Sequence, residues 1–358
     1  MLKISRENYS VKLSDPIVYV DNESRARSGH MTHAMAEYKK GAFIDFNSNC
    51  SAKRYGGHFP YGWVEYRTSE DCGKTYSDVK TLAYSYQCFI DGLNSVSVEK
   101  AVACDDGTIV AFCLRNDAMS PQFCEPWATP TVIRSCDCGK SWSEAVEYSP
   151  YPGRSYDALY HEGVIYVLHF CNPNFLGTSD EHKYRIYKSC DNGKSFSVLC
   201  EVPLDGMGRG YGSMLLDENN TLHVYAYNRH AENYIDHAIS RDFGKSWELL
   251  PPSYLKEGIR NPQTAILDGV FILHGRTKDR NGFVIYTSRN GCEWDEGVLV
   301  EHKNYMAGAY YSNNLNLEDE NGKFLLIQYS SPYTKEEAPE YVGTVNVKHM
   351  RLEIEKTK

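Results

Sequence analysis

Three arginines occur at similar places along the chain and could together bind an anion. Arg115, Arg229 and Arg276 each stand at the end of a segment rich in apolar residues. Arginine presents a planar fork of N–H donors that holds a carboxylate through two hydrogen bonds. If the three side chains converge, they form a clamp for an acidic sugar. The alternative for each arginine is a salt bridge between neighbouring elements.

Two carboxylates, a tyrosine and a histidine are candidates for the chemistry. Glu99 and Asp157 stand at the starts of two successive apolar segments. Two carboxylates across a cavity are the minimum for glycoside hydrolysis, because one protonates the leaving oxygen while the other attacks or activates water. Tyr311 is a candidate nucleophile or charge stabiliser, and His33 is a candidate acid or base near neutral pH. The alternative for each carboxylate is a structural hydrogen bond to backbone N–H groups.

The remaining candidates for substrate binding lie at the starts or ends of the same segments. They are Tyr156, Tyr211, Asn261, Gln263 and His274. Histidines are also concentrated near these positions, and the set comprises His30, His33, His58, His169, His230 and His274. Their spacing matches neither HxH nor HExxH, so we predict no metal site and no cofactor. Taken singly, each histidine is better explained as a structural hydrogen-bonding residue.

A repeated motif indicates which elements must position these residues. Residues 135–142 read Ser-Cys-Asp-Cys-Gly-Lys-Ser-Trp, close copies begin at Ser69, Ser189 and Ser240, and a shortened copy begins at Ser288. The Asp of the motif can accept backbone N–H groups to close a tight turn, while the Gly supplies a positive φ. The aromatic residue at its end is expected to pack into the core. The copies recur at about fifty residues, which suits a four-stranded propeller blade.

Six segments have the pattern of an inner strand followed by a hairpin. They begin at His33, Glu99, Tyr156, Tyr211, Asn261 and Tyr311. Asp-Gly or Asn-Gly turns between apolar runs are strong hairpin signals. We therefore predict an all-β fold, a six-bladed β-propeller of four-stranded antiparallel blades, with residues 1–358 as a single domain. Residues 11–20 are predicted to close the last blade by pairing with residues 323–352.

The propeller prediction places the candidate residues at one mouth. Inner strands begin there and second strands end there, so both sets of side chains should face it. Two long segments, residues 47–62 and 115–130, are expected to rise over the same face, where loops commonly carry function.

The chain resembles the Asp-box (BNR) repeat proteins, above all the sialidase superfamily, in these repeated motifs. The resemblance implies a six-bladed propeller whose boxes are structural and lie on the periphery. Family members carry arginines on blades four and five, which Arg229 and Arg276 match. They begin blade six with Tyr-Ser, as Tyr311 and Ser312 do here, and the tyrosine is their nucleophile. A neutral nucleophile avoids repulsion when the attacked carbon carries a carboxylate.

Three features depart from the sialidase pattern. The Phe-Arg-Ile-Pro motif of blade one is replaced by Met-Thr-His-Ala at residues 31–34. The glutamate that should begin blade four is absent, since residues 210–213 read Gly-Tyr-Gly-Ser. No clear aspartate occupies the acid/base loop of blade one, Arg54–Phe59. A glutamate-to-arginine spacing familiar from the family does occur, as Glu99 and Arg115, but on blade two.

The function that these observations favour is glycoside hydrolysis within the sialidase superfamily. We predict a divergent, exo-acting enzyme on a terminal sugar of a small oligosaccharide, and an acidic sugar if the arginines converge. One alternative is a lyase, in which a tyrosine or histidine removes the proton beside a uronate carboxylate. Another alternative is a carbohydrate-binding propeller without catalysis. Fold alone does not decide among them.

Composition sets limits on partners and compartment. The formal net charge is −9 and no basic stripe is present, so a nucleic-acid partner is not predicted. No apolar run reaches the length of a membrane span, and the N-terminus lacks the apolar core of a signal peptide. The 12 cysteines include the pair Cys136 and Cys138, which is too closely spaced for an ordinary disulfide. We therefore predict free thiols, a cytoplasmic location and a carbohydrate substrate; oligomeric state has no signal in the sequence.

Overall fold

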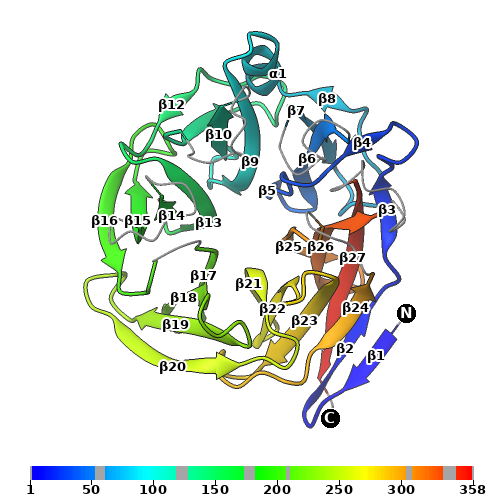
Figure 1. Ribbon diagram of the computed structural model, residues 1–358, viewed down its shortest axis with the longest axis vertical. Coiled ribbons are helices and arrows are strands. Elements are labelled where there is room, and N and C mark those ends of the chain that lie inside the picture. The colour runs from blue at the N-terminus through cyan, green and yellow to red at the C-terminus, as the bar shows by residue number, and fades with distance from the viewer. Residues whose placement is uncertain are drawn as a thin grey trace.

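Six β-sheets are arranged as blades around a central channel in the computed structural model of this chain (Figure 1). The structure describes residues 2–52, 61–117, 128–172, 182–206, 210–303, 309–333 and 344–356. Blades two to five are four-stranded antiparallel sheets, and blades one and six contain extra short strands. The predicted all-β, six-bladed propeller is therefore confirmed.

Blades two to five follow one another in chain order, from the inner strand to the outer one. Blade two contains β9 (Asn94–Ala103), β10 (Ile109–Asp117), β11 (Thr131–Ser135) and β12 (Val146–Glu147). Blade three contains β13 (Gly153–His161), β14 (Val164–Cys171), β15 (Lys183–Ser189) and β16 (Ser197–Val202). Blade four contains β17 (Gly212–Leu216), β18 (Leu222–Tyr227), β19 (Tyr234–Ser240) and β20 (Glu248–Tyr254). Blade five contains β21 (Arg260–Leu267), β22 (Val270–Arg276), β23 (Gly282–Ser288) and β24 (Val298–His302).

Blade one carries a helix at its outer edge. Its strands are β5 (Met35–Lys39), β6 (Ala42–Ser51), β7 (Gly62–Ser69) and β8 (Lys80–Thr81), and β4 (Arg27–Ser28) also pairs with β6. Helix α1 (Ala83–Ile90) follows β8. The buried Ser85 hydroxyl accepts the N–H of Val64 at 3.0 Å and donates to the carbonyl of Val96 at 3.1 Å. One side chain thus fastens α1 to β7 and to β9 of the next blade.

Blade six joins the two ends of the chain. It contains β25 (Ser312–Asp319), β26 (Gly322–Pro332), β27 (Val345–Lys356), β1 (Leu2–Ser5), β2 (Tyr9–Leu13) and β3 (Ile17–Val20). Both β2 and β3 pair with β27. The single strand predicted over residues 11–20 is therefore divided between β2 and β3, and β1 adds a further strand by pairing with β2. The interruption contains Pro16, which has no N–H to donate to a ladder.

The apolar core lies between neighbouring blades. Each of the six junctions has its own cluster of buried side chains. Phe46, Phe112, Phe170 and Phe283 on the second and third strands are fully buried in four of these clusters. Burying one such side chain contributes roughly 1.5–3 kcal/mol, so the ring is held by its junctions as well as by its sheets.

The repeated motif closes the turn between the third and fourth strands of a blade. In the copy on blade two, Asp137 Oδ1 accepts the Ser141 N–H at 2.9 Å and Asp137 Oδ2 accepts the Ser141 hydroxyl at 2.6 Å. Gly139 has φ of 77°, a value that a side chain rarely tolerates. Trp142 Nε1 lies 3.3 Å from the hydroxyl of Tyr66 on blade one. The turn therefore also joins its blade to the preceding one.

We predict that these turns lose their contribution to stability in acid. The Ser141 hydroxyl, followed by the Ser141 N–H, lowers the pKa of Asp137 to about 2 from 3.8. Because the folded-state pKa lies below the unfolded value, the contribution is present above pH about 4 and is lost as pH falls towards about 2. Asp137→Ala should therefore be less stable than the natural protein at neutral pH, and the gap should shrink in acid. Chemical denaturation of both proteins at neutral pH and in acid measures the difference in their free energies of unfolding. A difference that does not change with pH contradicts the prediction.

Two further observations bear on the protein's environment. The cysteines among the described residues have free thiols, and Cys124 lies outside those residues. No helix in the described part of the chain is long and apolar enough to cross a membrane.

Candidate active site

Irregularities in three inner strands alter which side chains face the channel. Glu99 of β9 and Tyr156 of β13 have no partner in the ladder with the second strand of their blade. The register of β21 also shifts between Arg260 and Gln263, where Asn261 has φ of 53°. A bulge of this kind re-aims side chains that strict alternation would send to opposite faces.

The end of the channel at which the inner strands begin contains a small cavity, here called the upper cavity. Its lining consists of Met31, His33, Glu99, Arg154, Tyr156, Tyr211, Gly212, Asn261, Pro262, Gln263, Tyr311 and Ser312. The structure thus brings most of the expected site residues together. The cavity volume is 40 Å³. Such a volume holds a few water molecules or a carboxylate group.

Two tyrosines meet in the upper cavity. The hydroxyls of Tyr211 and Tyr311 lie 3.4 Å apart, and both residues are buried. The ring of His30 packs edge-on against Tyr311 with centroids 4.4 Å apart. The backbone of Tyr311 is tied to β26, because its N–H donates to the Ser330 hydroxyl at 3.1 Å and its carbonyl accepts the Ser330 N–H at 2.9 Å. Tyr311 therefore has a defined position at the start of blade six.

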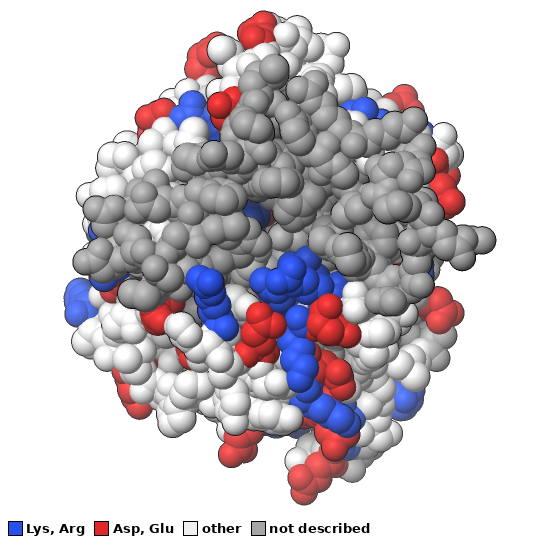
Figure 2. All heavy atoms as spheres, in the orientation of Figure 1, with Lys and Arg blue, Asp and Glu red and all other residues white. Residues whose placement is uncertain are grey.

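Two buried arginines adjoin the upper cavity but are not among its lining residues, with Arg276 beside Tyr311 and Arg260 beside Tyr227. Arg260 and Arg276 are directly opposite each other across β21 and β22, so their side chains emerge on the same face. The guanidinium of Arg276 lies 5.1 Å from the ring centroid of Tyr311. Arg260 is 5 % exposed and Arg276 is 3 % exposed. Figure 2 shows Lys and Arg side chains next to acidic ones over blade five, near the centre of the ring.

Both arginines have hydrogen-bond donors that no described residue occupies. Nε and Nη1 of Arg260 and Nε of Arg276 are buried and have no hydrogen-bond partner among the described residues. Burial, which disfavours the charged form, lowers the pKa of the Arg276 guanidinium below its usual value. A buried cation with unpaired donors is costly unless an anion binds it. This cluster is therefore suited to binding an anion.

A third arginine holds the carboxylate of Glu99. Arg154 Nε donates to Glu99 Oε2 at 2.9 Å, and Arg154 Nη2 also contacts that oxygen. Burial raises the pKa of the Glu99 carboxyl above its usual value, while the charge of Arg154 opposes the rise. The other oxygen, Oε1, is buried and has no hydrogen-bond partner among the described residues. Glu99 thus has one fixed oxygen and one that can exchange a proton with a ligand.

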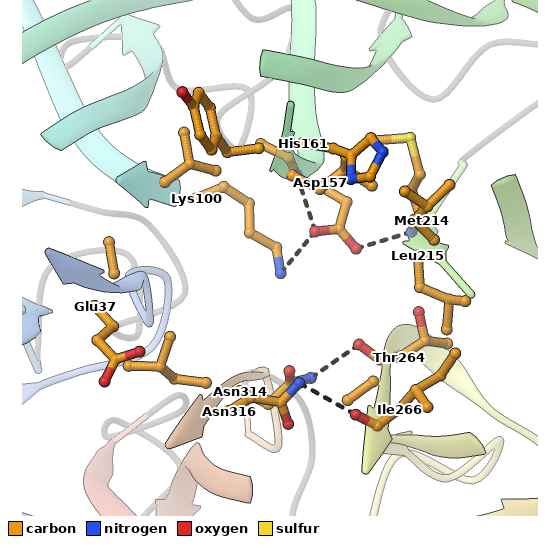
Figure 3. A pocket seen from close by; sticks show the side chains of 18 of the residues that line it. Glu37, Lys100, Asp157, His161, Met214, Leu215, Thr264, Ile266, Asn314 and Asn316 are labelled. Atoms are coloured by element: carbon orange, nitrogen blue, oxygen red, sulfur yellow. Dashed lines mark hydrogen bonds and ion pairs between the residues drawn. The ribbon is translucent and has the colours of Figure 1, made fainter. Parts of the chain in front are cut away.

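Asp157 lies in a different cavity from Glu99. At the opposite end of the channel a cavity of 690 Å³, here called the lower cavity, is lined by Lys100, Asp157 and Met214 among others (Figure 3). Asp157 Oδ1 lies 3.0 Å from Lys100 Nζ, and Oδ2 accepts the Ser213 hydroxyl at 2.6 Å and the Met214 N–H at 2.8 Å. Its carboxylate is therefore held by structural contacts, and the structure does not pair it with Glu99.

Lys100 separates the two cavities. Besides its ion pair with Asp157, its ammonium group donates to Gln263 Oε1 at 2.6 Å and to Asn313 Oδ1 at 2.6 Å. These four residues come from the inner strands of blades two, three, five and six. Gln263 is thus placed at the upper cavity, with its carbonyl oxygen already accepting from Lys100.

Two of the three expected arginines lie away from the upper cavity. Arg115 donates to the carbonyl of Thr129 at 2.7 Å and pairs with Glu147 on the outer strand β12. Arg229 is exposed beyond the end of β18 and lines a groove of 450 Å³ with residues of blades three and four. All three arginines stand at or near the end of a second strand, but that position does not determine whether the side chain faces the channel or points away from it. Of this set only Arg276 joins the cluster.

Arg154 and Arg260 take part in the cluster although sequence reasoning did not single them out. Inner strands β13 and β21 begin at Gly153 and Arg260, slightly before the starts expected at Tyr156 and Asn261. Each arginine stands within two residues of an expected start. Both arginines lie among the two residues before an expected strand start, so counting those residues as candidates would have included them.

The predicted histidines are mostly buried and hydrogen-bonded. His33 lines the upper cavity, and its ring nitrogens lie 2.9 Å from Gln328 Oε1 and 3.0 Å from the carbonyl of His30. Burial lowers the pKa of His33 to about 4. His274 contacts the Ser312 hydroxyl at 3.0 Å, and burial lowers its pKa to about 3. Both rings are therefore neutral at neutral pH.

Two of the segments expected near the site lie wholly or partly outside the described residues. His58 and the rest of the acid/base loop of blade one lie outside them, as do residues 118–127 of the second long segment. In the parts of the chain that the structure describes, no group of three or more His, Cys, Asp or Glu side chains could hold a metal ion.

Comparison with known proteins identifies only structural neighbours. No family model and no curated protein sequence matches the chain. A protein of unknown function from Dyadobacter fermentans superposes with a TM-score of 0.74 at 16% identity, covering 96% of this chain and 99% of that one. The Hadza microbial sialidase Hz136 gives a TM-score of 0.62 at 14% identity, covering 95% and 68%.

Two other sialidases have the same arrangement of blades. A mutant of the NanB sialidase from Streptococcus pneumoniae gives a TM-score of 0.65 at 10% identity, covering 95% of this chain and 70% of that one. The sialidase of Trypanosoma rangeli, solved as a covalent intermediate with 2,3-difluorosialic acid, gives 0.58 at 11% identity, covering 95% and 58%. At such identities the likeness concerns the fold, and activity has to be argued from the site.

Proposed function

We propose that this sialidase-like propeller is an exo-acting glycosidase that removes a terminal acidic sugar from a small oligosaccharide. The observation that carries the proposal is the buried Arg276 beside Tyr311, with the buried Arg260 directly opposite it on the neighbouring strand. Both arginines have donors without a hydrogen-bond partner among the described residues. A ligand carboxylate satisfies those donors and neutralises the buried charge. The upper cavity has room for the carboxylate, so the sugar ring is proposed to lie at the mouth above it.

The proposed reaction uses residues of the upper cavity. The Tyr311 oxygen forms a bond to the anomeric carbon while the bond to the leaving oxygen breaks, and Glu99 gives its proton to that oxygen. As it attacks, the Tyr311 hydroxyl releases its proton to solvent at the mouth, and Arg276 stabilises the negative charge that develops on the Tyr311 oxygen. In the second step Glu99 takes a proton from water, the resulting hydroxide displaces Tyr311 from the anomeric carbon, and the Tyr311 oxygen regains a proton from solvent. The raised pKa of Glu99 suits a group that must first be protonated.

A lyase is the second candidate, and the contact between Tyr211 and Tyr311 favours it. With hydroxyls 3.4 Å apart near arginines that neutralise a uronate carboxylate, one tyrosine, ionised beforehand, can remove the proton beside the carboxylate as base. The bond to the glycosidic oxygen then breaks, and the other tyrosine gives its proton to that oxygen. The product then contains a carbon–carbon double bond, which absorbs in the ultraviolet. A glycosidase yields the saturated free sugar. Incubation with acidic oligosaccharides and analysis of the products separates the two, and binding without any product supports a carbohydrate-binding propeller.

We predict that Arg260→Met and Arg276→Met each weaken binding of a free acidic monosaccharide. Loss of a buried, charge-assisted contact costs about 1.5–3 kcal/mol, or roughly ten- to a hundredfold in affinity. Because each variant removes a buried charge whose Nε has no hydrogen-bond partner among the described residues, we expect no loss of thermal stability. Calorimetry with sialic acid, glucuronic acid and galactose measures the effect, which should be confined to the two acids.

Arg115→Met provides the matched control for this experiment. This substitution also removes a guanidinium group, but at a position away from the upper cavity. Affinity for the acids should stay within about twofold of the unmodified protein. Equal losses in all three variants, or none in any, would contradict the assignment of the carboxylate to Arg260 and Arg276.

A further inference from the structure

Arg260 has a carboxylate close to it that does not hydrogen bond to it. Glu232, in the turn between β18 and β19, places Oε1 3.9 Å from Arg260 Nη1, which is beyond hydrogen-bond distance. The same oxygen accepts the hydroxyl of Tyr227, the last residue of β18. The ring of Tyr227 lies under the guanidinium of Arg260 at 5.2 Å. Tyr227 therefore contacts both charged groups.

This arrangement stabilises the arginine without occupying its donors. A negative charge a few ångströms away lowers the electrostatic cost of burying Arg260. The carboxylate oxygen accepts the Tyr227 hydroxyl, and Nε and Nη1 of Arg260 have no hydrogen-bond partner in the described part of the chain. Burial, followed by the hydrogen bond to Glu232, raises the pKa of Tyr227 to about 12, so the hydroxyl remains a donor at neutral pH.

We propose that Tyr227 makes Arg260 available to a ligand carboxylate at the upper cavity. Tyr227 is a positioning residue that holds Glu232 near Arg260 but beyond hydrogen-bond distance of its Nη1, so the protein's own carboxylate does not occupy the donors that the ligand needs. The inference rests on the proposed function in taking an acidic sugar as the ligand. It adds that the protein's own carboxylate, unless restrained, competes for the same donors.

The experiment is a double-variant cycle measured as affinity for sialic acid and glucuronic acid. In Tyr227→Phe the carboxylate of Glu232 is released and binds the open donors of Arg260, so affinity should fall about ten- to a hundredfold. In Glu232→Gln no competing charge exists, so affinity should be retained or improved. The double variant Tyr227→Phe/Glu232→Gln should recover that affinity, because the restraint is no longer needed.

The outcomes separate this inference from the proposed function. A Tyr227→Phe variant with unchanged affinity, or a double variant as weak as Tyr227→Phe, overturns the role of Tyr227. If the unmodified protein binds neither acid, the proposed function fails, and a crystal structure of Tyr227→Phe still decides the inference. There Glu232 should lie within hydrogen-bond distance of Arg260, and a carboxylate that stays near 3.9 Å from Nη1 overturns it.

Discussion

Tyr311→Phe is expected to lower turnover of an aryl glycoside of an acidic sugar by at least about a thousandfold, while affinity changes little. Phenylalanine keeps the ring that packs between His30 and Arg276 and removes only the oxygen proposed to attack the anomeric carbon. An interaction made only during reaction should affect kcat and leave ground-state binding intact. Steady-state kinetics with release of the aryl group, together with calorimetry for affinity, provides the measurement.

The neighbouring tyrosine supplies the control for this substitution. Tyr211→Phe removes a hydroxyl 3.4 Å from that of Tyr311, so it should lower turnover by about tenfold or less. With 2,3-difluorosialic acid, mass spectrometry of the unmodified protein should find an adduct on Tyr311, and Tyr311→Phe should form none. Full turnover by Tyr311→Phe would exclude it as nucleophile, and loss of an unsaturated product in that variant would instead support a base in a lyase.

Lys100→Met is expected to lower the free energy of unfolding by about 3–5 kcal/mol, because it leaves a buried carboxylate without its cation. Lys100 and Asp157 form an ion pair at 3.0 Å with side chains 10% and 7% exposed. The same substitution removes the Lys100 donor from the side-chain oxygens of Gln263 and Asn313, of which the Asn313 oxygen still accepts the Asn314 N–H at 2.9 Å. Four blades lose a common contact at the channel, so chemical denaturation should register a large change.

A surface lysine allows a matched comparison. Lys140 in the turn motif of blade two is exposed, and Lys140→Met should change stability by less than about 0.5 kcal/mol. The double variant Lys100→Met/Asp157→Asn should be more stable than Lys100→Met, since the unpaired charge is gone. A loss of less than about 1 kcal/mol in Lys100→Met would show that the ammonium group does not hold the blades together.

The number of blades could be predicted from the sequence because the same turn and hairpin patterns recur along the chain. Each full copy of the turn motif contains an Asp that binds its own backbone and a Gly at positive φ, and the shortened copy has Asn290 and Gly291 in these places. Both requirements are visible in the residues. Hairpin signals then mark the first two strands of each blade. Such features depend on residues within a few positions of one another, so they can be recognised without knowing the rest of the fold.

The site is harder to predict because it depends on which face a side chain takes. In β9 the bulge at Glu99 allows this residue to line the upper cavity while Lys100, its neighbour, reaches the lower one. Asp157 resembles Glu99 in sequence but stands one position past the bulge in β13 and serves the lower cavity. Arg115 shows the same difficulty, since its strand position is similar to that of Arg276 while its contacts lie outward.

A crystal structure with a bound acidic monosaccharide tests the central claim most directly. Our account predicts that the ligand carboxylate enters the upper cavity and accepts hydrogen bonds from Nε and Nη1 of Arg260 and from Nε of Arg276. The anomeric carbon should then face the hydroxyl of Tyr311. A carboxylate bound instead in the lower cavity or beside Arg229, with the donors of Arg260 and Arg276 still open, would contradict the account.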